Sequence, residues 1–267
     1  QGADICGQIV AVGQDIGPSR IGERVLIEPC LREADGAALD RAWYIGSECD
    51  GGFAQYTKVA AGHAYAINSD LTDVELASFP WSYSTAENML TRAGVDEGEQ
   101  VLVTGASGGV GSATVQLAKA RGATVLAQTS AAKASALLEL GASQVVKRGG
   151  DLLDTPGKNQ VDVVIDLVAG PQWPQLLDDL RPGGRYAVAG AIAGPLVELD
   201  VRTLYLKDLS LFGCTVLGAG VFSKLVEIIE QGQIKPLVEK SYPLQEITAA
   251  QCEFQKKNHV GKLVLEI

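Results

Sequence analysis

The sequence predicts an α/β protein with a doubly wound parallel sheet in the middle of the chain and β-rich segments at both ends. The apolar run 101–104 leads into four glycines within seven residues, and a helical pattern follows. Apolar strand-like runs then alternate with helical segments as far as residue 231, which favours a parallel sheet covered on both faces. Before residue 68 and after residue 232 the apolar runs are β-like.

Length, composition and charge exclude several classes of protein. The 267 residues, 46% of them apolar, are enough for two domains. A formal net charge of −10 leaves no broad basic field for nucleic acid or an anionic membrane. No apolar run approaches the roughly 18 residues that span a bilayer. Five widely separated cysteines, an odd number, indicate free thiols in a reducing compartment. A cytoplasmic protein with a small-molecule ligand is therefore expected.

The amino-terminal part alternates as short strands do, around one long polar stretch. We expect residues 29–52 to form an irregular loop. The expected strands here are a pair within 2–13, then 24–27, 53–59 and 64–67. A helix should begin at Thr72, because Glu75 stands three residues later as in a capping box.

From residue 101 onward the elements alternate regularly. The expected strands are 101–104, 123–128, 144–147, 161–167, 185–189 and 209–214. The expected helices are 109–121, 131–140, 172–180 and 221–231. After residue 232 two further strands, 237–242 and 262–267, should flank a helix near 245–256.

The glycines at 105–111 lie where a buried strand turns into a helix, and this context predicts a phosphate-binding turn. Gly105, Gly108 and Gly111 permit a tight turn, close approach of the backbone to a pyrophosphate and close helix packing. The helix start adds unpaired N–H groups and a positive dipole end. The remaining predicted contact residues of the turn are Ser107, Gly109 and Val110.

Seven collinear motifs make the chain resemble the medium-chain dehydrogenase/reductase superfamily over nearly its whole length. They are Gly7–Gly13 with Gly22–Val25, Asp50–Tyr56, Thr85–Ala86, Val101–Gly111, Val163–Asp166, Arg181–Arg185 and Gly261–Leu265. The resemblance implies a GroES-like catalytic domain from residues 1–68 and 233–267, a Rossmann domain from 69–232, and an active site in the cleft between them. Family members begin several dozen residues earlier, so we expect a partial GroES-like domain and a start at Gln1 that lies partway into it.

The second strand of the Rossmann domain selects the cofactor. An NAD site places an acidic residue at its end, but no Asp or Glu occurs between Gly105 and Glu139. Ser130 and Lys133 stand there instead, and the resemblance assigns the matching residues to a 2′-phosphate, with Arg148 adding a second cation. NADP(H) is the expected cofactor.

The resemblance also assigns residues after the later strands to the cofactor. Those expected along the adenosine and nicotinamide channel are Val168, Ala169, Gly190, Ala191 and Ile192. Those expected beside the carboxamide are Phe212, Gly213 and Cys214.

No metal site is expected from the residues present. In the zinc-dependent branch a cysteine precedes the Thr-Ala helix, but Trp81 aligns with it here, and an indole cannot bind zinc. Cys30 and Cys49 cannot alone close a structural zinc site, which needs four ligands. The two histidines, His63 and His259, lack partners at ligand spacing and are interpreted as surface or loop residues.

Catalysis without zinc requires hydroxyls, backbone amides or the cofactor ribose to stabilise the developing negative oxygen. Thr85 is the residue expected to touch the nicotinamide, and Tyr83 is the candidate proton donor.

We therefore predict an NADPH-dependent, zinc-free reductase of carbonyls, enones or quinones. Two alternatives remain at this point: a zinc-dependent alcohol dehydrogenase with ligands upstream of Gln1, and an NADPH-binding protein without turnover. A homodimer is expected through Leu209–Phe212 and the preceding segment 197–206.

Overall fold

The structure is a computed structural model that describes residues 1–34, 37–147, 159–256 and 258–267. It divides into two compact units, one made of Gln1–Ser84 with Val216–Ile267 and the other of Thr85–Thr215. The boundaries expected from the sequence, 68/69 and 232/233, both fall inside the first unit. Helix α2 (Pro80–Arg92) runs from the first unit into the second.

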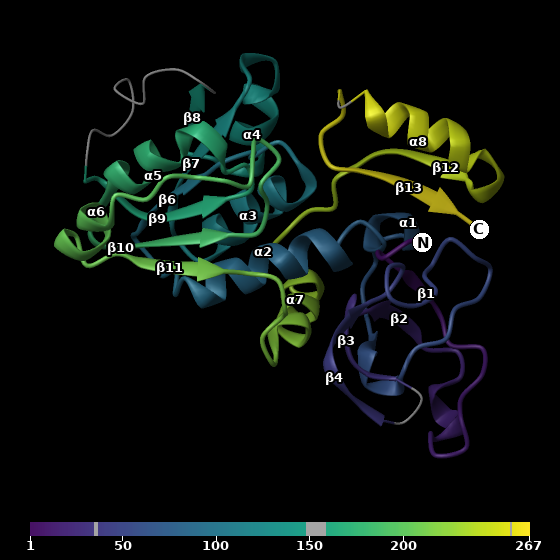
Figure 1. The fold of residues 1–267 in the computed structure, drawn as a ribbon. Coiled ribbons are helices and arrows are strands. Elements are labelled where there is room, and N and C mark those ends of the chain that lie inside the picture. Colours follow the sequence, from purple (N-terminus) through teal and green to yellow (C-terminus); the bar gives the residue numbers. More distant parts are fainter. Residues whose placement is uncertain (35–36, 148–158, 257) are drawn as a thin grey trace. The chain divides into compact units, whose positions relative to one another are not determined.

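The second unit is a six-stranded sheet in which every described strand pairing is parallel. Its strand order is β11-β10-β9-β6-β7-β8, so the direction of winding reverses between β6 and β9. Helices cover both faces, with α3 and α5 on opposite sides (Figure 1). Its strands are β6 (Gln100–Val103), β7 (Thr124–Thr129), β8 (Gln144–Lys147), β9 (Val161–Asp166), β10 (Leu180–Val188) and β11 (Ser210–Gly213). Its helices are the end of α2, α3 (Gly109–Ala120), α4 (Ala134–Leu140), α5 (Trp173–Asp179) and α6 (Val201–Leu206). This confirms the predicted doubly wound sheet.

The first unit is built from short strands. They are β1 (Cys6–Gln8), β2 (Arg24–Ile27), β3 (Cys30–Ala34), β4 (Ala37–Tyr44), β5 (Ala64–Ala66), β12 (Val238–Pro243) and β13 (Lys262–Glu266). Its helices are α1 (Asp73–Leu76), α7 (Val221–Glu230) and α8 (Ile247–Gln255). Strands β1, β2 and β5 form an antiparallel sheet, β3 and β4 a hairpin, and β12 and β13 a parallel pair. The amino-terminal and carboxyl-terminal parts of the chain therefore share one unit.

Four predictions of secondary structure differ from the structure. The strand pair expected within residues 2–13 is a single strand, β1, which pairs with β2. Residues 29–52 contain the β3–β4 hairpin rather than only a loop. Residues 53–59 form no strand, because the amides of Gly52 and Phe53 donate to the carbonyls of Gly2 and Gln1 instead of to a partner strand. The segment 197–206 contains helix α6, whose first turn is capped by the carboxylate of Asp200 accepting from the Arg202 amide at 2.9 Å.

The predicted capping box at Thr72 is confirmed. Its hydroxyl accepts from the Glu75 amide at 3.3 Å, and the Glu75 carboxylate accepts from the Thr72 amide at 2.8 Å. These two bonds satisfy amides that an α-helix leaves unpaired at its start, and they hold the pKa of the Glu75 carboxyl below its usual range. Among the described residues, no helix has the length and hydropathy needed to cross a membrane.

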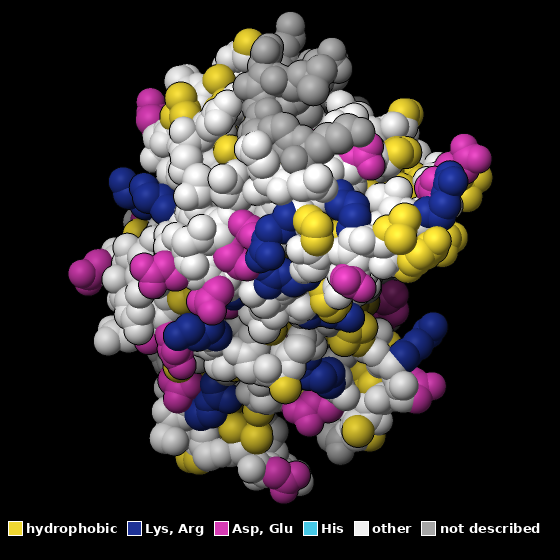
Figure 2. Space-filling view, turned by 90° about the vertical axis from the view of Figure 1, so that its left-hand side faces the viewer, with side chains coloured by type: hydrophobic (Ala, Val, Ile, Leu, Met, Phe, Trp, Pro, Cys, Tyr) yellow, Lys and Arg dark blue, Asp and Glu magenta, His cyan; other side chains and the backbone are white. Residues whose placement is uncertain are grey.

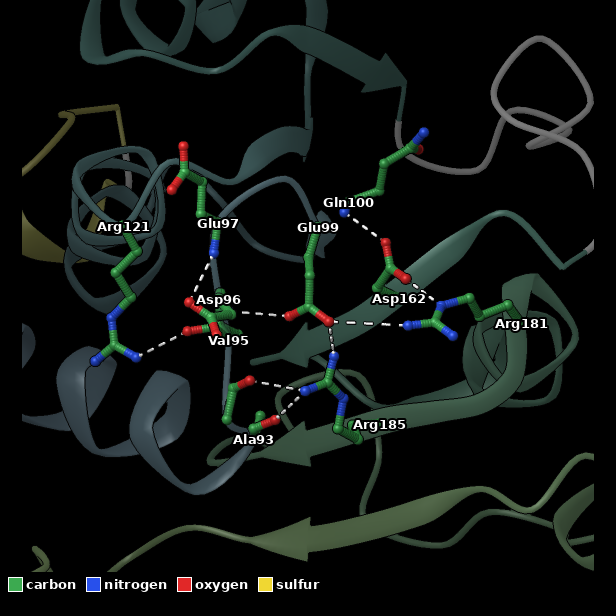
Figure 3. A network of polar contacts seen from close by, with 11 residues as sticks. Ala93, Val95, Asp96, Glu97, Glu99, Gln100, Arg121, Asp162, Arg181 and Arg185 are labelled. Atoms are coloured by element: carbon green, nitrogen blue, oxygen red, sulfur yellow. Dashed lines mark hydrogen bonds and ion pairs between the residues drawn. The ribbon is translucent and has the colours of Figure 1, made fainter.

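A polar network joins the amino ends of the central strands (Figure 3). The Arg185 guanidinium donates to the carbonyls of Ala93 and Gly94 at 2.9 and 2.7 Å and pairs with Glu99. Arg181 pairs with Asp162, whose other oxygen accepts from the Gln100 amide at 2.7 Å. The two arginines of the Arg181–Arg185 motif thus tie β10 to β6 and β9.

Replacing Arg185 with alanine should lower the free energy of unfolding by about 2–3 kcal/mol, because it removes a donor from two carbonyls and the closer of the two arginines that pair with the largely buried Glu99. Arg181→Ala is the matched control: this side chain is 46% exposed, so its loss should cost less than about 1 kcal/mol. Urea unfolding of both variants measures the difference. Equal losses in the two variants would contradict this ranking.

Candidate cofactor site

The glycine-rich turn between β6 and α3 has the backbone geometry that its sequence predicted. Gly105 has φ +58°, a left-handed conformation that favours glycine. Its carbonyl accepts from the Gly108 amide at 3.0 Å, which closes the turn. Gly108 precedes the helix without any side-chain cap, so the first amides of α3 remain available to an anion.

The three glycines of the motif have different roles in this turn. A Cβ on Gly111 would lie 2.3 Å from the Gly105 carbonyl oxygen, so only glycine lets the helix pack this close to the turn. A Cβ on Gly108 would meet nothing nearer than that same oxygen, at 3.5 Å. The fold therefore leaves open space for a methyl group beside Gly108. Ser107 belongs to the same turn, and Gly109 and Val110 begin α3.

The end of β7 brings Ser130 and Lys133 beside the glycine turn. The Ala106 amide donates to the Gln128 carbonyl at 3.2 Å, which ties the turn to β7. Directly after β7 a single helical turn is closed by the Lys133 amide donating to the Ser130 carbonyl at 3.0 Å. Ser130 is exposed and Lys133 half-buried. Arg148, the third residue predicted here, lies outside the described residues.

The segments after β9 and β10 meet the glycine turn at the point where the winding reverses. A Cβ on Gly105 would lie 3.0 Å from Cγ2 of Val168, and one on Gly190 would lie 2.6 Å from the Leu167 carbonyl oxygen. Ala191 and Ile192 are exposed at this edge. Ligands of open α/β sheets bind where the winding reverses, outside the carboxyl ends of the strands. The structure thus brings the predicted residues of β6, β9 and β10 together.

Cys214, directly after β11, is buried. The backbone amide of Cys214 donates to the Val188 carbonyl at 2.8 Å. Burial raises the pKa of this thiol, so it stays protonated at neutral pH. Phe212 is half-buried and Gly213 is exposed. Among these three residues, Gly213 offers the most accessible backbone.

The predicted catalytic residues Tyr83 and Thr85 both lie on helix α2. The Tyr83 side chain is buried, and its hydroxyl donates to the Lys235 carbonyl at 2.9 Å. Thr85 is half-buried two residues further along. The Tyr83 proton is thus engaged by the backbone in this structure.

The residues at the start of α2 do not fit a zinc site. The Trp81 amide donates to Asp4 Oδ1 at 2.6 Å, and Asp4 Oδ2 pairs with Lys262 at 2.7 Å. The Trp81 ring packs edge-on against Tyr44. Among the described residues, no group of three or more His, Cys, Asp or Glu side chains could hold a metal ion.

The interpretation of both histidines as surface or loop residues is wrong for His63, which is buried. Its Nε2 accepts from the Arg32 amide at 3.0 Å, and its Nδ1 lies 3.4 Å from a carboxylate oxygen of Glu28. The Glu28 carboxylate also accepts from Arg32 at 2.5 Å and from Tyr65 at 3.1 Å. Spacing in the sequence gave no signal for this cluster, because its members come from separate elements of the first unit.

The strand order and the glycine turn define a dinucleotide-binding Rossmann unit. Comparison with known proteins specifies the family. The family described as "Alcohol dehydrogenase GroES-like domain" matches residues 1–69, and the one described as "Zinc-binding dehydrogenase" matches residues 109–231. The chain belongs to the medium-chain dehydrogenase/reductase superfamily and is an oxidoreductase of that superfamily.

Individual proteins similar to this chain include two curated enzymes. An acryloyl-coenzyme A reductase of Metallosphaera sedula is 30% identical over 99% of this chain and 82% of its own length. A quinone oxidoreductase of Rattus norvegicus is 29% identical over 99% of this chain and 78% of its own length. The solved structure of a Sinorhizobium meliloti protein described as a "putative alcohol dehydrogenase" is 49% identical, with a TM-score of 0.91 over 100% of this chain and 76% of that one.

Proposed function

We propose that the protein is an NADP(H)-dependent oxidoreductase that transfers hydride to a carbonyl, an enone or a quinone without catalytic zinc. The observation that carries the cofactor choice is the turn after β7. Ser130 and Lys133 stand there, and no acidic residue occurs between Gly105 and Glu139. A carboxylate there would bind a ribose 2′-hydroxyl and repel a 2′-phosphate, whereas a hydroxyl and an ammonium favour the phosphate. Solved structures of the same fold include complexes with NADP.

The bound cofactor would supply the hydride, and the chain would supply binding, orientation and charge stabilisation. The glycine turn and the start of α3 hold the pyrophosphate. Thr85 would contact the nicotinamide and help to orient it for hydride transfer. Tyr83 could donate a proton to the reduced substrate only after its hydroxyl breaks the hydrogen bond to the Lys235 carbonyl and forms one to the substrate oxygen.

The similar enzymes act on compounds that contain a carbon–carbon double bond conjugated to a carbonyl. This chemistry is common to acryloyl thioesters and quinones, the substrates that the names of the similar enzymes state. We propose that an activated alkene of this kind is the acceptor. Simple aldehydes and ketones are the competing class, as in an alcohol dehydrogenase.

The experiment compares binding and turnover of the two reduced cofactors. We expect tighter binding of NADPH than of NADH in a fluorescence titration, and oxidation of NADPH in the presence of a quinone, an enone or an acryloyl thioester. Preference for NADH would refute the cofactor assignment. NADPH binding without oxidation by any quinone, enone, thioester, aldehyde or ketone would favour the alternative of a binding protein without turnover.

A zinc-dependent alcohol dehydrogenase is the second candidate, favoured by the name of the family that matches residues 109–231. Elemental analysis of the purified protein separates the two candidates. Stoichiometric zinc, lost together with activity on chelation and restored with it, would establish this candidate. Activity that survives chelation would support the zinc-free proposal.

We also propose a homodimer that pairs the edge strand β11 with its symmetry mate. In the strand order β11 occupies one edge and β8 the other, and Leu211 on β11 is 39% exposed. Further exposed apolar side chains lie just before this strand, at Val201, Tyr205 and Leu206. An unpaired strand edge beside apolar surface favours association with a second copy.

Replacing Leu211 with arginine should convert the protein from dimer to monomer at micromolar concentration, because a charged side chain on an edge strand opposes pairing between copies. Leu138→Arg is the matched control, since this exposed leucine lies on α4, which precedes the opposite edge strand. Sizing with light scattering measures the mass. A wild-type protein that runs as a monomer would remove the basis for the dimer.

A further inference from the structure

One buried carboxylate joins the ends of three neighbouring strands in the second unit. Asp166 ends β9 and is fully buried. Its Oδ1 accepts from the Thr104 hydroxyl, directly after β6, at 2.5 Å, and its Oδ2 accepts from the Tyr186 hydroxyl on β10. These bonds cross the order β10-β9-β6, which contains the point where the winding reverses. Sequence analysis placed Asp166 in a family motif but assigned it no role.

The same carboxylate holds the turn that follows β9. Its Oδ1 accepts from the amides of Val168 and Ala169 at 2.8 and 3.1 Å. The Thr104 hydroxyl in turn accepts from the Leu167 amide at 3.0 Å. Three successive amides of the turn are therefore bound to Asp166 or to the hydroxyl that Asp166 orients.

The backbone of this turn is strained, so something must hold it in place. Ala169 has φ +53° and ψ −145°, a region that residues other than glycine rarely adopt. The two other described residues with positive φ that are not glycine are Asn159 and Asp208, whose side chain types tolerate it. Gly170 follows with φ +75°, and a Cβ there would lie 2.7 Å from the Ala193 carbonyl oxygen.

The strained turn packs against both segments to which we assign the cofactor. Val168 contacts the glycine turn at Gly105, and its carbonyl accepts from the Ala193 amide at 3.0 Å. The Leu167 carbonyl lies so close to Gly190 that a Cβ there would approach it to 2.6 Å. A shift of the turn would therefore displace the glycine turn after β6 or the segment after β10.

We propose that Asp166 is a positioning residue of the cofactor site, which holds the turn 167–170 in its strained conformation and so fixes the dinucleotide-binding surface at the ends of β6, β9 and β10. The proposal rests on the proposed cofactor function. The donors that the structure shows for the Asp166 carboxylate are uncharged hydroxyls and amides. The carboxylate therefore acts through the positions of its two acceptor oxygens rather than through an ion pair. Asparagine keeps one such acceptor oxygen at the same place, whereas alanine keeps none.

The test combines substitutions at Asp166 with relief of the strain at Ala169. Asp166→Ala should raise KM and Kd for NADPH at least about tenfold while kcat at saturating NADPH changes less than about threefold, the pattern of lost uniform binding. Asp166→Asn should stay within about threefold of the wild type for both constants. Ala169→Gly should recover about threefold or more of the affinity that Asp166→Ala loses, because glycine adopts positive φ without strain.

A second readout needs no cofactor. In the wild-type protein without ligand, hydrogen exchange at the amides of Val168 and Ala169 should be slow, and in Asp166→Ala it should be at least about tenfold faster. A folded Asp166→Ala variant with wild-type hydrogen exchange or wild-type NADPH affinity would overturn the proposal. A loss of NADPH affinity that is not avoided in Asp166→Asn and not reduced by adding Ala169→Gly would also overturn it. If Asp166→Ala does not fold, Thr104→Val takes its place, since it removes the hydroxyl that links Asp166 to the Leu167 amide. Failure of the proposed function is recognised separately, because the wild-type protein itself would then bind no dinucleotide.

Discussion

Gly111→Ala should abolish NADPH binding and lower the free energy of unfolding by about 2–3 kcal/mol, the usual cost of overpacking a tight contact. The added methyl would stand 2.3 Å from the Gly105 carbonyl oxygen and 2.6 Å from Cα of Ala106. Both are backbone atoms, so the helix and the turn must move apart. Such a movement withdraws the first amides of α3 from the position at which they would bind the pyrophosphate.

Gly108→Ala is the matched control in the same turn. Its backbone has φ −78°, which alanine adopts without strain, and the new methyl meets its nearest atom at 3.5 Å. We expect a loss of less than about 1 kcal/mol in stability, since alanine is the poorer residue at this helix start. The methyl occupies the room assigned to the phosphates, so NADPH affinity should still fall at least tenfold, about 1.4 kcal/mol.

Urea unfolding and NADPH titration of the two variants give four values. The expected result is a loss of NADPH affinity in both variants. The larger loss in the free energy of unfolding should occur in Gly111→Ala. Unchanged NADPH affinity in Gly108→Ala would show that the open space at the turn is not the phosphate site. Unchanged stability in Gly111→Ala would show that the close packing of α3 on the turn is not required.

The central sheet could be predicted because local and global preferences agree there. In the strand Val161–Asp166 four of the six residues are β-branched and all but Asp162 are buried, so the sequence pattern and the environment indicate the same structure. The glycine turn was predictable for a similar reason, since Gly105 and Gly111 are the residue type that the backbone needs.

The errors lie where pairing with a distant segment decides the structure. Strand β4, Ala37–Tyr44, contains alanines and charged residues of low β propensity, and it is a strand because β3 pairs with it. Residues 53–59 alternate as a strand does, but no partner strand pairs with them. Strand propensity is a weak guide without a partner, and the sequence alone does not name the partner.

The candidate site divides along the same line. Residues directly after a strand, such as Ser130 and Gly190, could be predicted, because parallel strands end at one edge of the sheet. The contacts of Asp166 could not, because Thr104 and Tyr186 become its neighbours only through the order β10-β9-β6. The buried His63 was missed for the same reason, since Glu28 follows β2 and becomes a neighbour of His63 only in the folded unit.

Lys133→Glu should reverse the cofactor preference by weakening NADPH binding about 100-fold or more, which corresponds to roughly 2.7 kcal/mol. Under the proposed cofactor assignment, the Lys133 ammonium offers a positive charge to the 2′-phosphate after the end of β7. The variant puts a carboxylate in its place, which repels the phosphate and can accept a hydrogen bond from a free ribose 2′-hydroxyl. NADH affinity should therefore stay constant or rise.

Lys119→Glu is the matched control for this change of charge. Lys119 lies in the last turn of α3, at the opposite end of this helix from the glycine turn, so the same change in net charge should leave both affinities within about twofold. The NADPH affinity of Lys133→Glu should also lose most of its salt dependence, because the attraction between the ammonium and the 2′-phosphate is gone. Titrations with NADPH and NADH at low and at physiological ionic strength measure these effects. If Lys133→Glu weakened the binding of NADPH and NADH equally, the lysine would lie beside a group that both cofactors contain. Residues other than Lys133 would then discriminate between the two cofactors.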